Sequence, residues 1–189
     1  MAGPTLPTPS QTVGPFFNIG LPGVDSKLVP EGVDGAIRLT GVVYDGEGEV
    51  VPDALLEIWQ ANRSGRYDHP DDRRDDLPLE EGFRGDGRVE TGEDGRFEFV
   101  TVKPGPVPGP DGAQQAPHIM MSVLARGLLT RLATRVYFGD EAQANEADPV
   151  LSSVEPDRRE TLVATADGDG AYRFDVRLQG DGETVFLDI

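Results

Sequence analysis

The chain has 189 residues, which is enough for one domain with a substantial hydrophobic core. It carries 34 acidic against 17 basic side chains, a net charge of −17, so nucleic acid and anionic membrane surfaces are not expected as partners. The absence of cysteine excludes disulfides, thiol catalysis and cysteine-based zinc sites. No apolar run approaches the roughly 20 residues that span a bilayer, and the start lacks a secretory signal pattern, so we expect a cytoplasmic protein.

The first predicted element is an extended N-terminal arm, roughly residues 1–30. It is rich in proline and glycine and has few strand signals. An arm of this length often packs on a partner subunit, and a disordered tail is an equally ordinary interpretation. We predict that the arm packs on a partner.

Short apolar segments with a two-residue period follow the arm, separated by turns rich in glycine, aspartate and proline. We predict strands at Ala36–Asp45, Ala54–Ala61, Arg96–Val102, His118–Ala125, Thr134–Phe138, Glu160–Thr165 and Ala171–Leu178. This spacing is typical of an antiparallel sandwich or barrel. We therefore predict an all-β fold, an antiparallel β-sandwich with long loops and little helix, in a single domain over residues 1–189.

Helical and loop segments interrupt this pattern. The segment Gly139–Ala147 predicts one or two helical turns, which Pro149 should end. Two long loops are expected at Ser64–Gly87 and at the proline-rich segment Pro104–Pro117. Long loops on a β scaffold are where function usually lies.

The only histidines are His69 and His118. His118 lies in a predicted apolar strand, where a hydrogen-bonded core histidine is the more ordinary interpretation. A His-x-His strand would direct two imidazoles to one metal ion, because alternate residues share a face. Met120 stands at that second position, and its thioether is a poor ligand for a hard ferric ion. His69 lies in the acidic loop "YDHPDD", where a solvated histidine is expected.

Tyrosines and carboxylates are the remaining candidates for chemistry. Tyrosinate is a hard oxygen donor that suits Fe(III), and Tyr67 follows "NRSGR" at the mouth of a long loop; a packing role is equally compatible with the sequence. The acidic cluster Asp71–Asp76 lacks the ligand spacing of an EF-hand and is interpreted as surface charge. No serine-nucleophile or phosphate-loop motif occurs.

Several motifs together resemble the intradiol ring-cleavage dioxygenases. They are "TPSQTVGPFF", "LTGVVYDGEGEVVPDALLEIWQAN", "GRY", "TVKPGP", "APHIMMSVLARG", "RRETL" and "AYRFDVRLQGDGETVFLDI", and they span nearly the whole chain. Each motif alone is weak, and the set is highly specific. The resemblance is to the α chain of a heteromeric member, whose α and β chains share an ancestor.

The resemblance implies a non-haem Fe(III) held by two tyrosines and two histidines in catalytic chains. Tyr67 falls on the first tyrosine and His118 on the first histidine. Val107 replaces the second tyrosine, and Met120 replaces the second histidine. We therefore expect a vestigial metal site, no metal on this chain, and no catalytic residue of its own.

The resemblance further implies that Fe(III) is bound by a homologous β chain, with αβ units in a higher oligomer. The complex would cleave an aromatic acid, 3,4-dihydroxybenzoate, with O2 to 3-carboxy-cis,cis-muconate. Residues of the α chain would line the β-chain site: Thr12, Gly14, Pro15 and Phe16 of the arm, and Arg126. A guanidinium such as that of Arg126 can bind the substrate carboxylate through two hydrogen bonds.

Two alternatives remain open from the sequence. The chain could be a self-sufficient dioxygenase that binds metal through Tyr67, His118 and a further group such as His69. It could instead be a non-enzymatic β-sandwich module that uses Trp59 and the Pro104–Pro117 loop to bind a carbohydrate or a protein.

Overall fold

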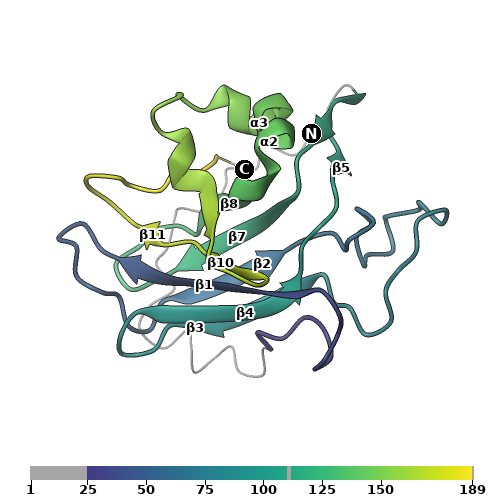
Figure 1. Cartoon of the computed structure of the whole chain (residues 1–189). Coiled ribbons are helices and arrows are strands. Elements are labelled where there is room, and N and C mark those ends of the chain that lie inside the picture. The colour runs from purple at the N-terminus through teal and green to yellow at the C-terminus, as the bar shows by residue number, and fades with distance from the viewer. Residues whose placement is uncertain (1–24, 110–111, 189) are drawn as a thin grey trace, which may run out of the picture.

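The computed structural model describes residues 25–109 and 112–188. Nine strands form one continuous sheet, and two short strands pair separately (Figure 1). The strands of the sheet are β1 (Ala36–Tyr44), β2 (Leu55–Trp59), β3 (Asp86–Glu90), β4 (Arg96–Val102), β7 (His118–Leu124), β8 (Leu132–Phe138), β9 (Val163–Ala166), β10 (Ala171–Arg173) and β11 (Val176–Arg177). The separate pair is β5 (Val107–Pro108) with β6 (Gln114–Gln115). The all-β prediction with little helix is confirmed.

The strand order in the sheet is β11-β1-β10-β9-β8-β7-β2-β3, and β4 pairs with β1. Strand β1 is antiparallel to β4, and β7 is antiparallel to both β2 and β8, as predicted. The prediction of a purely antiparallel sheet is wrong, because β1 runs parallel to β10 and β11, and β8 runs parallel to β9. Non-local parallel pairing leaves no trace in a strand's own two-residue pattern.

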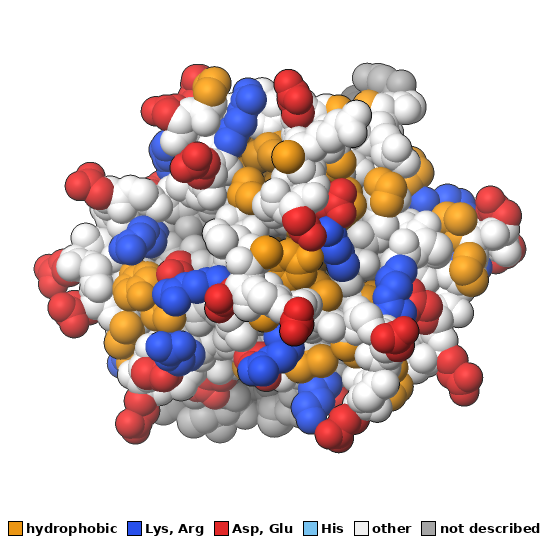
Figure 2. Space-filling model, viewed as in Figure 1, with side chains coloured by type: hydrophobic (Ala, Val, Ile, Leu, Met, Phe, Trp, Pro, Cys, Tyr) orange, Lys and Arg blue, Asp and Glu red, His pale blue; other side chains and the backbone are white. Residues whose placement is uncertain are grey.

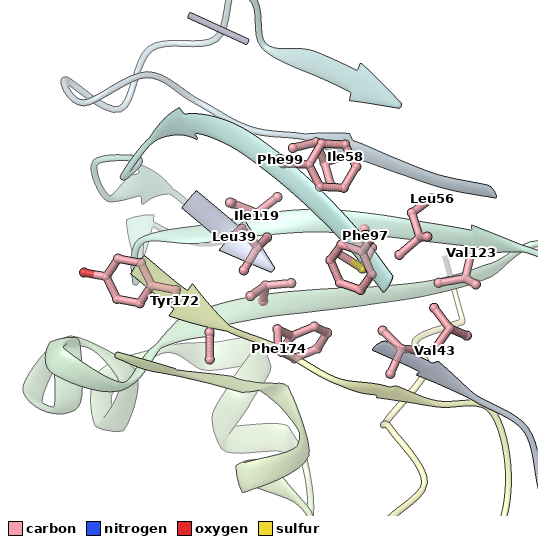
Figure 3. Packing of buried hydrophobic residues seen from close by; sticks show 14 of the residues in the cluster. Leu39, Val43, Leu56, Ile58, Phe97, Phe99, Ile119, Val123, Tyr172 and Phe174 are labelled. Carbon is pink, nitrogen blue, oxygen red and sulfur yellow. The ribbon is translucent and has the colours of Figure 1, made fainter. Parts of the chain in front are cut away.

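The main hydrophobic core lies between β1 and β4 on one side and β2, β7 and β8 on the other. Leu39, Phe99 and Ile119 are fully buried there, and Figure 3 shows these side chains pointing toward one another from different strands. Alternate residues of β7 supply this core, because Ile119, Met121 and Val123 share one face. His118 and Met120 therefore point to the opposite face of the sheet.

Two short helices cover part of that opposite face beside β8 (Figure 1). They are α2 (Ala142–Ala147) and α3 (Pro149–Ser153). The predicted helix at Gly139–Ala147 is confirmed, and Pro149 follows its end. Pro149 also begins a second helix that the sequence analysis missed, because proline is well suited to the first helical position when the preceding residue caps the helix.

The C-terminal strands are shorter than predicted. A 3-10 turn, Arg159–Leu162, occupies most of the segment predicted as a strand at Glu160–Thr165, and β9 begins only at Val163. The strand predicted over Ala171–Leu178 is divided into β10 and β11 around Phe174. The carbonyl of Phe174 lies where a Cβ on Gly41 of β1 would stand, so only glycine permits this approach of the two backbones.

The predicted arm lies mostly outside the described residues. Its last part, 25–30, packs on its own chain: Leu28 and Val29 are buried, and the amide of Leu28 donates to the carbonyl of Val100. Both predicted loops occur. The proline-rich loop Pro104–Pro117 contains the β5–β6 pair. The loop Ser64–Gly87 ends at β3, a strand that was not predicted.

The surface carries mixed charge. Figure 2 shows acidic and basic side chains interspersed over the visible face. Among the described residues, no helix is both long and apolar enough to cross a membrane.

Candidate functional site

The candidate site lies on the face of β2, β7 and β8 that points away from the main core. Trp59 of β2 pairs with Met120 of β7, and Met120 pairs with Arg135 of β8. Residues directly opposite in an antiparallel sheet project to the same face. Trp59, Met120 and Arg135 therefore form one row across three strands. His118, two residues before Met120, pairs with Tyr137 in the next row.

Arg135 connects several side chains of this face. Its Nε contacts the sulfur of Met120 at 3.2 Å, and its Nη1 donates to the side-chain oxygen of Gln115 at 2.6 Å. Nη1 also lies 3.3 Å from the hydroxyl oxygen of Tyr137. Arg135 forms no salt bridge with any residue of the described ranges 25–109 and 112–188. The direct contacts of its guanidinium are therefore all with neutral side chains.

His118 is buried, with 5% of its surface exposed. Its Nδ1 lies 2.8 Å from the carbonyl oxygen of Ala116. Because a carbonyl can only accept, Nδ1 carries the proton and Nε2 keeps its lone pair. Burial, together with the positive charge of Arg135, lowers the pKa of His118 to about 4, so the imidazole is neutral at pH 7. The prediction of a hydrogen-bonded, buried histidine is confirmed.

Tyr67 stacks on Trp59, with ring centroids 5.8 Å apart and ring planes within 6° of parallel. Burial raises the pKa of Tyr67, so its phenol is protonated at neutral pH. The amide of Tyr67 donates to Asp72, whose carboxylate also pairs with Arg74; that hydrogen bond holds the pKa of Asp72 well below its usual range. These contacts fix the start of the long loop against the sheet.

An open pocket of about 390 Å³ lies beside this stack. Its lining residues are Trp59, Tyr67, His69, Asp71, Asp72, Arg74 and Pro108. His69 meets Trp59 edge-on, at 5.9 Å between centroids, and its side chain is 47% exposed beside Asp71. The prediction of a solvated loop histidine is confirmed.

Val107 is buried in β5, directly opposite Gln115 of β6. Gln115 is the residue that accepts from Arg135. Val107 therefore belongs to the same group of side chains as Met120, although the two positions are far apart in the sequence. Of the four predicted metal-site positions, Met120 contacts Arg135 directly. Val107 and His118 are linked to Arg135 through Gln115 and Tyr137, and Tyr67 stacks on Trp59, the strand partner of Met120.

A buried carboxylate closes the other side of the group. Asp148 is fully buried and accepts from the hydroxyl of Tyr137 at 2.9 Å. It also accepts from the amides of Val150 and Leu151 as the cap of α3, and from the amide of Ala116 before β7. Tyr137 is thus held between Arg135 and Asp148, and burial raises its pKa.

These residues do not fit a ferric ion. A protonated phenol, one imidazole, a valine and a methionine offer too few hard donors, and a guanidinium stands among them. No cluster of three or more His, Asp or Glu side chains able to hold a metal occurs in the part of the chain that the structure describes.

Arg126 lies two residues beyond the end of β7 opposite to His118, and the strand itself is roughly 20 Å long at the rise of a β-strand. Its Nε pairs with Asp53 at 2.9 Å, and its side chain is 58% exposed. It does not approach the vestigial site. Thr12, Gly14, Pro15 and Phe16 lie outside the described residues.

Comparison with known proteins agrees with this geometry. A family model described as Dioxygenase matches residues 25–180, and the chain belongs to this family of intradiol dioxygenases. It is 48% identical to the protocatechuate 3,4-dioxygenase alpha chain of Burkholderia cepacia, over 96% of this chain and 97% of that one. It is 37% identical to the beta chain from the same organism, over 78% of this chain and 66% of that one.

A solved structure shows the same fold. It is the dioxygenase domain of a carbohydrate-binding fusion protein from Streptomyces sp. SirexAA-E, 27% identical, with a TM-score of 0.60. The alignment covers 92% of this chain and 99% of that one. The family match and the similarity to alpha chains favour a dioxygenase subunit over the alternative of a non-enzymatic binding module.

The side chains that organise the site were not predicted from the sequence. Arg135, Gln115, Tyr137 and Asp148 were not identified as functional or structural partners. One signal was present: "LATRVYF" places a charged residue inside an otherwise apolar strand, on the same face as a tyrosine two positions later. The contact with Met120 was not readable, because it depends on the pairing of β7 with β8.

Proposed function

We propose that this chain is the α subunit of a protocatechuate 3,4-dioxygenase and that it supports catalysis in a β chain without binding iron itself. The vestigial site carries this proposal. The chain matches an alpha chain over 96% of its length. At Met120, one of the two substituted ligand positions, the guanidinium of Arg135 contacts the side chain. The complex cleaves 3,4-dihydroxybenzoate with O2 to 3-carboxy-cis,cis-muconate.

The partner is a homologous β chain, and the two form αβ units in a larger assembly. In this proposal the β chain binds Fe(III), and this chain binds no cofactor. The similarity of this chain to both α and β chains of one organism supports a shared ancestry for the two subunits. No catalytic step is assigned to the residues of this chain.

The contribution of this chain to the reaction is to shape the substrate site of the partner. Arg126 is an exposed cation on the rim of the sheet, held by a single carboxylate, so it is free to bind the carboxylate of an aromatic acid. Thr12, Gly14, Pro15 and Phe16 of the N-terminal arm complete the wall of that site. The arm packs on the β chain in this proposal.

The same proposal includes the domain organisation and location. Residues 1–189 form one domain, and β1 and β4 face β2, β7 and β8 across the main core as the two layers of a β-sandwich. The assembly operates in the cytoplasm.

Reconstitution tests the proposed function. The two chains are purified separately, and O2 uptake with 3,4-dihydroxybenzoate is measured for each chain and for the mixture. We expect rapid uptake only from the mixture, or at least a large increase in kcat/KM over the β chain alone. Full activity of this chain alone would overturn the proposal in favour of the self-sufficient enzyme.

A further inference from the structure

The positive charge of Arg135 is the feature of the vestigial site that the proposed function does not use. Arg135 forms no direct salt bridge within the described residues, although the chain carries twice as many acidic as basic side chains. The buried carboxylate of Asp148 is connected to it only through the hydroxyl of Tyr137. A partly buried guanidinium without a directly bound anion is costly unless neutral groups satisfy it. Gln115, Tyr137 and Met120 do so here.

Each of the four vestigial positions reaches this guanidinium by a short path. Met120 contacts Nε directly. Val107 is the strand partner of Gln115, which accepts from Nη1. The ring of His118 lies 5.8 Å from that of Tyr137, whose hydroxyl is 3.3 Å from Nη1.

Tyr67 lies on the loop side of the guanidinium. It stacks on Trp59, the strand partner of Met120, and the positive charge of Arg135 acts on its phenol. The guanidinium therefore contacts one of the four positions and lies near the other three. A metal ion bound at these positions would lie close to the guanidinium of Arg135. In a region of low dielectric constant the two positive charges would repel each other strongly.

We propose that Arg135 prevents metal ions from binding at the vestigial site. Its guanidinium already places a positive charge where the charge of the metal ion would be. The site then lost metal binding through two differences: the substitution of two ligands by Val107 and Met120, and the presence of Arg135. Restoring the two ligands restores metal binding only when Arg135 is also made neutral. His118 is already in the correct form for this, since its Nδ1 proton is held by Ala116 and its Nε2 keeps a lone pair.

The test is made on the full chain expressed alone. Val107→Tyr and Met120→His are combined to restore the ligand types, first with Arg135 present and then with Arg135→Gln. The matched control adds Arg131→Gln instead, an exposed residue just before β8 whose loss changes the net charge equally. Arg135→Lys in the same background keeps the charge and changes the shape.

Two readouts are used: iron per chain after incubation with Fe(III), and the broad visible band of tyrosinate bound to Fe(III). We expect the variant with Arg135→Gln to hold at least about tenfold more iron than the one with Arg135, and to show the band. The variants with Arg131→Gln and Arg135→Lys should stay colourless.

The proposal fails if the Val107→Tyr/Met120→His variant binds the same amount of iron per chain with Arg135 as with Arg135→Gln. Absence of iron from a folded chain with Arg135→Gln would also overturn it. Folding is checked by far-ultraviolet circular dichroism, and Arg135→Leu provides a second neutral variant. If neither neutral variant folds while Arg135→Lys does, the charge serves the fold rather than metal exclusion, and the proposal fails. The result does not depend on the partner subunit, so it is separable from the reconstitution test.

Discussion

The two ends of strand β7 show opposite uses of an arginine. At the His118 end, Arg135 is enclosed by neutral side chains and lies beside a buried carboxylate network. At the other end, Arg126 is 58% exposed and pairs only with Asp53. The enclosed arginine has its hydrogen bonds fixed within the chain, whereas the exposed one can exchange its partner for another anion.

In the proposed function, the His118 end is a vestigial metal site whose side chains are satisfied within the chain, so it contributes to stability. The Arg126 end is exposed and contributes to the substrate site of the partner. Changes at the His118 end should therefore alter folding, and changes at the Arg126 end should alter catalysis by the complex.

The largest expected effect is from Asp148→Ala. The change removes the cap of α3 and leaves the hydroxyl of Tyr137 and the amide of Ala116 without their acceptor. We expect a loss of about 3 kcal/mol in the free energy of unfolding, measured with urea. The exposed Asp157→Ala is the control, and an equal effect of both changes would refute the role of Asp148.

The next effect is a pH dependence at the same end of the strand. The pKa of His118 is about 4 in the folded chain and near its ordinary value of 6.5 in the unfolded chain. The unfolded chain therefore binds the extra proton first as the pH falls. The stability that His118 contributes is present above pH 6.5 and is lost as the pH falls toward 4.

We expect wild type to lose about 2 kcal/mol more than His118→Gln when the free energy of unfolding is compared at pH 7.5 and pH 4.5. Urea titrations of both proteins across this range give the difference directly. Parallel pH profiles for the two proteins would contradict the buried neutral imidazole.

At the open end, Arg126→Ala should change catalysis more than stability. The surface ion pair with Asp53 contributes at most about 1 kcal/mol to the free energy of unfolding. In the assembled complex we expect KM for 3,4-dihydroxybenzoate to rise about tenfold, since a charged hydrogen bond to the carboxylate is lost. Steady-state O2 uptake measures this, with Arg131→Ala as the control. An unchanged KM would remove Arg126 from the proposed substrate wall.

The smallest expected effect is from His69→Ala. His69 is half exposed and meets Trp59 only at its edge. The free energy of unfolding should change by less than about 0.5 kcal/mol, and the iron content of the complex should not change. Loss of iron on this substitution would revive the self-sufficient alternative.

The sequence predicted most of the local structure. The two-residue pattern placed β4 at its observed bounds and β1, β2, β7 and β8 within a few residues. It could not predict the parallel partners of β1, because those contacts join segments more than a hundred residues apart. Pro149 was taken only as the end of a helix, although an aspartate directly before a proline is also a signal for the start of one.

The site was predicted in part. The resemblance identified Tyr67, Val107, His118 and Met120 as one group, and the structure places Met120 against Arg135 with the other three linked to it through Gln115, Tyr137 and Trp59. The organising arginine was missed because a strand's sequence does not reveal its neighbour across the sheet. The register of β7 with β8 sets Arg135 opposite Met120, and only folding creates that contact.

The most direct test of the central claim is the iron content and visible absorption of this chain purified alone and after co-expression with a β chain. The account predicts a colourless, iron-free chain alone and a red-brown complex with one iron per αβ unit. Stoichiometric iron and the tyrosinate band in the chain alone would contradict the account.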